Sequence, residues 1–382
     1  MSEWKEYTIG EICLRFSSGK SIKASQISAE GLYPVYGGNG LRGFTDTFNF
    51  DGECSIIGRQ GAYCGNVRYF KGKAFMTEHA IVAVVNENHN NGYVSNLLSM
   101  MNLAQYQGQS AQPGLSVSTL SKLTIKLPDL ATQEQCFNVV NLLDKKIQTN
   151  NQINQELEAM AKTLYDYWFV QFDFPDQNGK PYKSSGGKMV YNPELKREIP
   201  EGWGVEKLGD ITICHDSKRV PLSSNDRELV KGKIPYYGAT GIMDYVNDYI
   251  FDGDYVLMAE DGSVMTEKGS PILQRISGKN WVNNHAHVLE PIKNHSCKLL
   301  MMLLKDVSVM KIKTGSIQMK INQENMNKIV VLAIPLELLF EINQKLEVID
   351  KQQLNLIEEN KQLTQLRDWL LPMLMNGQVK VE

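Results

Sequence analysis

The strongest constraint on the fold is that the chain repeats itself after about 200 residues. The phrase YPVYGGNG at 33–40 returns as IPYYGATG at 234–241, with four of eight positions identical. Three further matches follow the same spacing: WKEYTIGEI (4–12) with WGVEKLGDI (203–211), FDGE (50–53) with FDGD (251–254), and EHAIV (78–82) with NHAHV (284–288). Solenoid repeats are only about 20–50 residues long. This internal duplication therefore indicates two copies of a whole domain in series.

Each copy is predicted to be β-rich at first and to end in a long helix. Short apolar runs such as CSIIG (54–58), AIVAVV (80–85) and YVLMA (255–259) are separated by Gly, Asn and Asp, which is typical of strands joined by turns. After each β-rich part, mostly apolar positions recur at alternating spacings of three and four, over 143–168 and 339–374. This heptad pattern favours a coiled coil.

Asn150, Asn154 and Asn360 fall on the heptad seam. Polar residues at such positions specify the register of a coiled coil at some cost in stability. The alternative is a pair of amphipathic helices that pack on separate globules.

The order of the parts predicts the architecture. A second helix that packs along the first must run back in the opposite direction, because each helix follows its own globule. We expect an α+β fold with two similar β-rich domains, each followed by a long helix, and an antiparallel coiled coil between the helices. The result is a pseudo-two-fold dumbbell, which suits duplex DNA read by two units about 34–36 Å apart. The predicted boundaries are domains at 1–130 and 203–335, helices at 131–175 and 336–382, and a connecting segment at 176–202.

Composition is that of an ordinary globular protein, with 42% hydrophobic residues, 22% charged residues and a net charge of −3. The acidic excess lies in the two helical segments, whereas 59–73 carries four basic residues and no acidic one. No run is apolar enough to cross a membrane, and the N-terminus lacks the apolar core of a signal peptide. The six cysteines are scattered without a CxxC pair. We therefore expect a cytoplasmic protein with reduced thiols and no membrane partner.

The sequence predicts neither catalytic nor metal-binding residues. It contains no phosphate-binding loop and no dinucleotide-binding loop. The Asn192-Pro193 pair is followed by Glu194, so the Asn-Pro-Pro-aromatic motif of adenine methyltransferases is missing. His285 and His287 form a His-x-His without further ligands at suitable spacing, which favours structural or DNA-contacting roles.

The stretch at 164–203 resembles the central conserved region of the specificity subunit of type I restriction-modification enzymes. The segments WFVQFDFP, NGKPYKSSGGKMV and REIPEGW occur there together and in order. GSPILQRISGKNWVNNHAHVL at 269–289 is similar to a target recognition domain of that family. The resemblance covers the whole chain, because the order of two domains and two helices is the family's own.

The resemblance implies that each β-rich domain is a target recognition domain that reads one half of a split, asymmetric site in double-stranded DNA. It implies that the helices dock two modification (methyltransferase) subunits, which bring S-adenosylmethionine and methylate adenine. Restriction (translocase and nuclease) subunits join through these, and the chain itself is non-catalytic and binds no cofactor. The alternatives are a stand-alone enzyme such as a hydrolase, or a carbohydrate-binding or structural repeat protein.

In the first domain, the DNA-binding residues are predicted around the Gly-bounded loop at 58–66. Direct readout pairs Arg or Lys with guanine and Asn or Gln with adenine, whereas phosphate contacts use basic and small polar groups. The candidates are Arg59 and Gln60 for bases, Arg68, Lys71 and Lys73 for phosphates, and Asn39 and Arg42 beside the repeated phrase.

In the second domain, the aligned loop is AEDGSVMTEKG at 259–269. Glu260 and Asp261 replace Arg59 and Gln60 there, and a carboxylate can accept a hydrogen bond from the amino group of cytosine. The remaining candidates contact phosphate or bases, and they are Lys268, Lys311, Lys313, Gln318 and Lys320.

Overall fold

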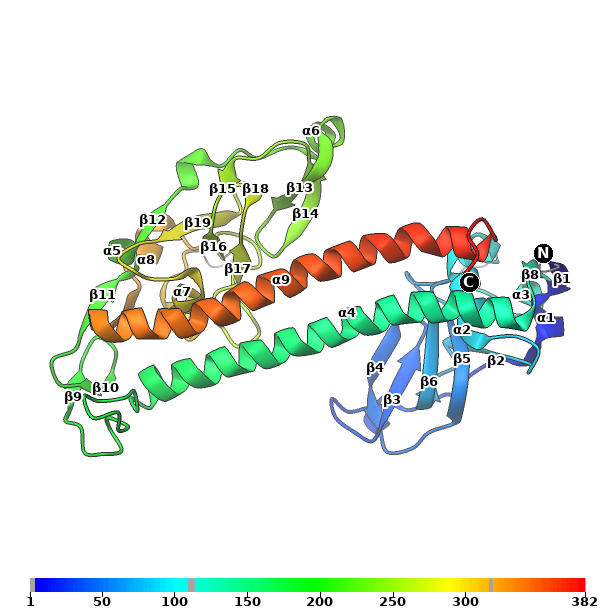
Figure 1. Cartoon of the computed structure of the whole chain (residues 1–382), viewed down its shortest axis with the longest axis horizontal. Helices are drawn as coiled ribbons and strands as arrows, with labels where there is room; N and C mark the ends of the chain where they lie inside the picture. The colour runs from blue at the N-terminus through cyan, green and yellow to red at the C-terminus, as the bar shows by residue number, and fades with distance from the viewer. Residues whose placement is uncertain (1–3, 109–113, 316–318, 382) are drawn as a thin grey trace. The chain divides into compact units, whose positions relative to one another are not determined.

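The computed structural model describes residues 4–108, 114–315 and 319–381 (Figure 1). The chain divides into two compact units, one made of residues 1–151 and 358–382 and the other of residues 152–357. Each unit contains one β-rich domain and one stretch of each long helix. The structure therefore has the predicted α+β composition, with the two domains following the sequence repeat.

The first unit is built around a six-stranded sheet of order β2-β7-β5-β6-β3-β4, and a separate antiparallel pair joins β1 to β8 (Figure 1). Its strands are β1 (Lys5–Thr8), β2 (Cys13–Ser18), β3 (Tyr33–Gly37), β4 (Gly40–Thr45), β5 (Phe50–Gly58), β6 (Val67–Met76), β7 (Ala80–Val85) and β8 (Thr124–Leu127). Its helices are α1 (Ile9–Ile12), η1 (Ala24–Gln26), α2 (Asn91–Met100), η2 (Leu103–Tyr106), α3 (Val117–Leu120) and the first part of α4 (Leu130–Tyr165).

The second unit repeats this plan with the sheet divided in two, of orders β12-β19-β16-β17 and β14-β13-β18-β15. Its strands are β9 (Met189–Asn192), β10 (Arg197–Pro200), β11 (Gly204–Lys207), β12 (Thr212–Cys214), β13 (Lys231–Tyr237), β14 (Ile242–Val246), β15 (Phe251–Asp252), β16 (Tyr255–Ala259), β17 (Leu273–Ile276), β18 (Lys279–Val282), β19 (Ala286–Pro291) and β20 (Val330–Ala333). Its helices are η3 (Asp166–Val170), α5 (Leu208–Ile211), η4 (Asp216–Lys218), α6 (Ser224–Leu229), α7 (Cys297–Leu304), η5 (Val309–Lys311), α8 (Gln323–Asn327) and the first part of α9 (Leu336–Met375).

The repeated phrase forms the same strand and turn in both domains. β3 pairs in parallel with β6 and continues through the turn into antiparallel β4, and β13 does the same with β18 and β14. Gly40 and Gly241 have φ of +98° and +154° in these turns, a region that side chains with a Cβ rarely adopt. The phrase is repeated because two copies of one turn require it.

Equivalent helices begin with equivalent caps. The Asn90 side chain accepts a hydrogen bond from Tyr93 N at the start of α2, and the Ser296 side chain accepts one from Leu299 N at the start of α7. Asn and Ser are favoured at this position because they satisfy a backbone donor that the helix leaves free. Both helices then bury an apolar face against their sheet, through Tyr93 and Leu98 in α2 and through Leu299 and Leu303 in α7.

The two long helices run antiparallel within each unit. In the first unit, Arg367 of α9 pairs with Asp144 of α4 at 3.0 Å, and Asn150 of α4 donates to Asn360 of α9 at 2.9 Å. In the second unit, Gln353 of α9 donates to the carbonyl oxygen of Asn154 in α4. Residue numbers rise along one helix as they fall along the other, so the predicted antiparallel pairing is confirmed.

The WFVQFDFP and REIPEGW segments form an aromatic cluster in the second unit. Trp203 lies against Phe174 and Phe172, with ring centroids 5.0 and 5.9 Å apart, and Phe174 stacks on Tyr182 at 4.8 Å. Phe172 and Phe174 are buried. The aromatic residues of this stretch thus hold the segment that follows α4 in one compact fold.

Candidate nucleic-acid interface

The two predicted recognition loops occupy equivalent positions in the two domains. Gly58 ends β5 opposite Ala80, and Ala259 ends β16 opposite Ala286. The next residues are held alike, because Arg59 N donates to the His79 carbonyl at 3.0 Å and Glu260 N donates to the His285 carbonyl at 2.8 Å. One position later, Gln60 bridges to Gly114 and Asp261 bridges to Lys320. The loops therefore differ in side chains and share a backbone framework.

In the first domain, the glycine turn of the repeated phrase lies against this loop. A Cβ on Gly40 would come within 2.9 Å of the Arg68 guanidinium, and one on Gly37 within 2.7 Å of the Arg42 side chain. A Cβ on Gly38 would come within 2.8 Å of the His79 carbonyl oxygen. The predicted residues that this packing brings together are Asn39, Arg42, Arg59, Gln60 and Arg68.

Lys71 and Lys73 lie apart from that group. They are on β6, where Lys71 pairs with Glu53 at 2.7 Å and Lys73 lies 3.8 Å from Asp51. Positions 71 and 73 are four and six residues along the strand from position 67, which at ~3.3 Å per residue is about 13 and 20 Å. The structure thus does not bring these two predicted phosphate contacts to the loop.

Glu260 is engaged inside the second domain. One carboxylate oxygen lies 2.6 Å from Arg219 Nη1 and the other 3.0 Å from Lys320 Nζ, and its side chain is 11% exposed. Burial raises the pKa of Glu260, but the hydrogen bonds and charges of Arg219 and Lys320 outweigh burial and hold this pKa below its usual value. The predicted contact of Glu260 with cytosine is not favoured, because both oxygens already have cationic partners.

The neighbouring Asp261 points its carboxylate to His285, whose Nδ1 lies 2.5 Å from Asp261 Oδ1. The predicted lysines of this domain lie in two adjoining loops, since Val309 N donates to the Gly269 carbonyl and Lys320 bridges to Asp261. Lys268, Lys311 and Lys320 are exposed, and Lys313 is partly exposed. Gln318 lies outside the described residues.

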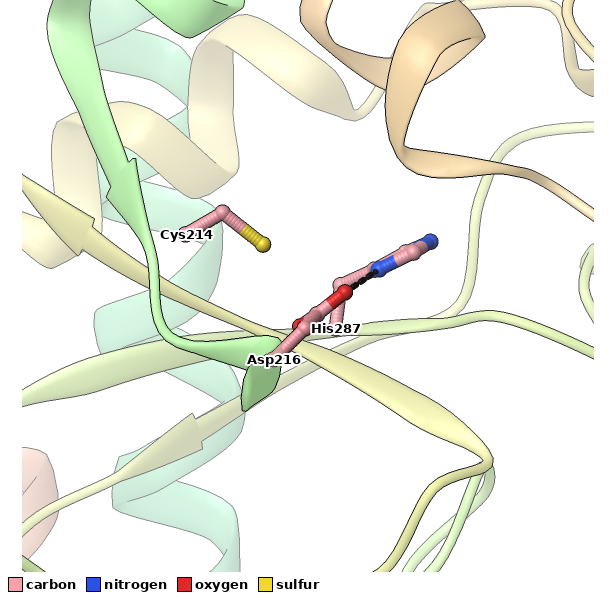
Figure 2. A group of neighbouring side chains, drawn as sticks. All are labelled: Cys214, Asp216 and His287. Carbon is pink, nitrogen blue, oxygen red and sulfur yellow. Dashed lines mark hydrogen bonds and ion pairs between the residues drawn. The ribbon is translucent and has the colours of Figure 1, made fainter. Parts of the chain in front are cut away.

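A polar cluster of Asp216, His287 and Arg219 contacts Glu260 of the second loop, and Figure 2 shows Asp216 and His287 of this cluster. Asp216 pairs with His287 through Nδ1 and with Arg219 at 3.2 Å, and it also accepts a hydrogen bond from Val288 N. His287 is 1% exposed, and its Nε2 lies 2.8 Å from the Ile321 carbonyl oxygen. Burial raises the pKa of Asp216, but His287 and Arg219 outweigh burial and lower it below the usual value.

Cys214, Asp216 and His287 place their ligand atoms within 4.8 Å of one another, an arrangement compatible in principle with a metal ion. The partners of these groups argue against a metal. The Arg219 guanidinium already supplies a positive charge 3.2 Å from Asp216, and both ring nitrogens of His287 already have hydrogen-bond partners. The cluster is better suited to holding the loop in shape.

A family model described as the type I restriction modification DNA specificity domain matches residues 1–159 and 200–365. The chain belongs to this family. Its two matched segments each contain one of the equivalent loops, so the chain has two copies of the specificity domain.

Two relatives of the chain are named as specificity subunits of type I restriction enzymes. The type I restriction enzyme EcoprrI specificity subunit of Escherichia coli is 40% identical over 157 residues, covering 40% of this chain and 38% of that protein. The MjaIX specificity subunit of Methanocaldococcus jannaschii is 26% identical over 301 residues, covering 73% of this chain and 66% of that protein. The matches thus span about two fifths and two thirds of these relatives.

A solved structure supports the fold. The S subunit of a type I restriction-modification system from M. genitalium has a TM-score of 0.62 and 17% identity, covering 98% of this chain and 96% of that one. Within the described residues, no helix is long and apolar enough to cross a membrane.

Sequence reasoning singled out His285 for a structural or DNA-contacting role, but it missed His79, Arg219 and Asp216 as supporting residues of the two loops. His79 and His285 each contact their loop through a backbone carbonyl and a side chain. Arg219 and Asp216 come from a segment more than 40 residues before Glu260. The repeated EHA and NHA segments were the available signal, because they place one histidine at the same position of both domains.

Proposed function

We propose that this chain is the sequence-specific DNA-binding subunit of a type I restriction-modification complex. Each domain reads one half of a split, asymmetric site in double-stranded DNA. The chain has no catalytic activity of its own and binds no cofactor. It directs two modification subunits, which supply S-adenosylmethionine and methylate adenine in the cytoplasm, and restriction subunits join through them.

One observation carries this proposal: equivalent loops on equivalent backbone frameworks present different chemistry. The first loop carries Arg59 and Gln60, whereas the second carries Asp261 beside Glu260, which is paired inside the domain. A shared framework would approach DNA in the same way, while different side chains would select different bases. The target would therefore have two unlike halves.

The helices offer surfaces for partner subunits. In the first unit, Leu142 and Trp369 are 65% and 58% exposed. In the second unit, Met160, Phe340 and Val348 are 59%, 63% and 68% exposed. Exposed apolar side chains mark a protein-binding surface where they form a contiguous patch. These residues are therefore the first to substitute in a test of docking on the helices.

The test is to co-express the chain with its modification subunit in cells that lack adenine methylation and then to map methylated adenines across the genome. The expected result is one split motif with two different halves, which depends on both proteins. Methyl transfer by the purified chain alone, or a continuous methylated motif, would contradict the proposal.

A binding experiment separates this function from the alternatives. The complex should bind its duplex with an affinity that falls steeply as salt increases, because phosphate contacts release counterions. A hydrolase would turn over a substrate without partners, and a carbohydrate-binding protein would bind glycans with little dependence on salt.

A further inference from the structure

The two histidines that hold the recognition loops occupy the same place in both domains. His79 lies between β6 and β7, and His285 lies between β18 and β19. Each accepts a hydrogen bond on its carbonyl oxygen from the first residue of the loop, Arg59 or Glu260. Their position relative to the loop is therefore fixed by backbone and does not depend on which bases are read.

Each histidine also pairs with the second side chain of its loop. His79 Nδ1 lies 3.2 Å from Gln60 Oε1, and His285 Nδ1 lies 2.5 Å from Asp261 Oδ1. The two imidazoles are 45% and 48% exposed. In each domain an exposed histidine thus meets one loop side chain, which is exposed in Gln60 and partly buried in Asp261.

In the Asp261–His285 pair, the direction of the hydrogen bond is defined. A carboxylate only accepts hydrogen bonds, so His285 Nδ1 carries the hydrogen. The second Asp261 oxygen remains an acceptor, and no hydrogen bond to the His285 Nε2 is found among the described residues. An acceptor at this position matches the amino group that cytosine presents in the major groove.

The Gln60–His79 pair presents a hydrogen-bond donor at the equivalent position of the first domain, where Asp261 presents an acceptor in the second. With its oxygen turned to His79 Nδ1, Gln60 can donate from its amide NH₂, for which no acceptor is found among residues 4–108, 114–315 and 319–381. His79 Nε2 lies 3.6 Å from a carboxylate oxygen of Glu78, which is too far for a hydrogen bond. A donor at this position matches base acceptors such as those of adenine N7 or guanine O6.

We propose that Gln60–His79 and Asp261–His285 are equivalent two-residue readers, each determining one base pair of its half-site. The histidine positions the loop side chain and the loop side chain sets the base preference. This inference rests on the proposed function and deepens it. The base preference of the second domain is thereby assigned to Asp261 and His285. Glu260 is excluded from this role because Arg219 and Lys320 hold it.

The experiment uses the full chain with its modification subunit and maps the methylated motif of each variant. Gln60→Asp should change the preferred base at one position of the first half-site, and Asp261→Gln should do the same in the second half-site. Each change should shift that position by at least about fivefold in relative methylation, which corresponds to the lower end of the ~1–3 kcal/mol assigned to a good base contact. His79→Ala and His285→Ala should relax the same positions without altering the others.

His215→Gln is the matched control. His215 directly follows β12 and pairs with Glu290 at 2.5 Å in the same domain, and no hydrogen bond or ion pair joins its side chain to 259–269 among the described residues. It should leave the methylated motif unchanged.

The outcomes are distinguishable from those of the proposed function. If the wild-type complex methylates a split motif and Asp261→Gln keeps every base preference, this inference is wrong and the function stands. If His285→Ala lowers methylation of all sequences equally, the pair is structural and the inference is also wrong. A wild-type complex without any split motif would overturn the proposed function itself.

Discussion

The first recognition domain contacts the helices through neutral groups, whereas the second is held by ion pairs. In the first unit, Gln133 of α4 is fully buried; it accepts from Asn90 N at 2.9 Å and donates to the Pro128 carbonyl at 2.8 Å. Phe137 of α4 lies with its ring 5.1 Å from that of Tyr69 on β6.

In the second unit, the ammonium of Lys298 on α7 contacts Glu158 of α4 and lies 2.8 Å from Gln353 Oε1 of α9. Arg275 of β17 pairs with Asp350 of α9 at 3.1 Å. The difference teaches that the duplication preserved the sheet framework and its turns, while the attachments to the helices diverged. The two domains should therefore fail under different conditions.

The largest expected effect comes from removing Glu158. Its loss leaves the Lys298 ammonium, whose side chain is 6% exposed, with Gln353 as its remaining partner. An uncompensated buried charge costs about 3–5 kcal/mol. Glu158→Ala should lower the free energy of unfolding of the second unit by this amount, as measured by denaturant titration of the full chain with hydrogen exchange of the α7 peptide.

Lys298→Met is the matched variant. It leaves behind Glu158, which is 52% exposed and remains hydrated, and it fills the space with a flexible apolar side chain. It should cost much less than Glu158→Ala. Equal losses from the two variants would show that the pair does not attach the domain through a buried charge.

The next largest effect is expected in acid, which should destabilise the second domain before the first. Asp216 and Glu260 have pKa values held below their usual 3.8 and 4.5, because His287, Arg219 and Lys320 outweigh the effect of burial. A lowered pKa contributes stability above the unfolded value, and this contribution is lost as pH falls through the folded value. Each charged hydrogen bond is worth about 1.5–3 kcal/mol.

The first domain has Ile81 at the position of His287 and Arg59 at that of Glu260, so it lacks this acid-sensitive cluster. Between about pH 5 and pH 3, exchange protection of β19 should therefore fall before that of β7, after correction for intrinsic exchange. Simultaneous loss in both strands would contradict the comparison. The Glu260→Gln variant should show a smaller decline in β19.

The repeat made the framework predictable from the sequence. The glycine-containing phrase occurs twice, and each copy predicts the same strand and turn in its domain. The heptad spacing predicts both long helices. The equivalence of the loops at 58–66 and 259–269 was also predictable, because both follow an apolar strand ending at Gly58 or Ala259.

The roles of individual loop residues were not predictable. Glu260 was interpreted as a base contact because its partners Arg219 and Lys320 are distant in sequence. Lys71 and Lys73 were grouped with the loop by sequence proximity, yet an extended strand moves them away from it. Side-chain pairing across a fold leaves no periodic pattern in a single sequence.

Gln133 provides a neutral counterpart to Glu158. Gln133→Ala leaves the Asn90 amide and the Pro128 carbonyl without their partner in a buried place, which costs about 1–3 kcal/mol. The loss should be confined to the first unit and should not change with salt, since no charge is involved. Gln135→Ala is the control on the same helix and in the same unit, because Gln135 is exposed. Equal effects of the two variants on unfolding would contradict this assignment.

The smallest expected effect tests the helix pair itself, in the first unit. Asn150 is fully buried, its Nδ2 donates to Glu359 and Asn360, and its Oδ1 has no partner among the described residues. Asn150→Leu removes a buried polar group and leaves two partly exposed residues that water can satisfy. Unfolding should become harder by about 0.5–1 kcal/mol, since replacing an imperfectly paired polar group by an apolar one is often neutral or stabilising. The register of the helix pair should become less well defined in return, because a polar seam residue penalises shifted pairings.

Cross-linking measures this register. A photo-reactive amino acid at Asp144 should cross-link in one place near Arg367 in the otherwise wild-type chain, since these residues pair at 3.0 Å. When Asn150→Leu is added, it should cross-link at several places along α9. A single cross-linking position in both backgrounds would show that the register is set by the apolar residues alone.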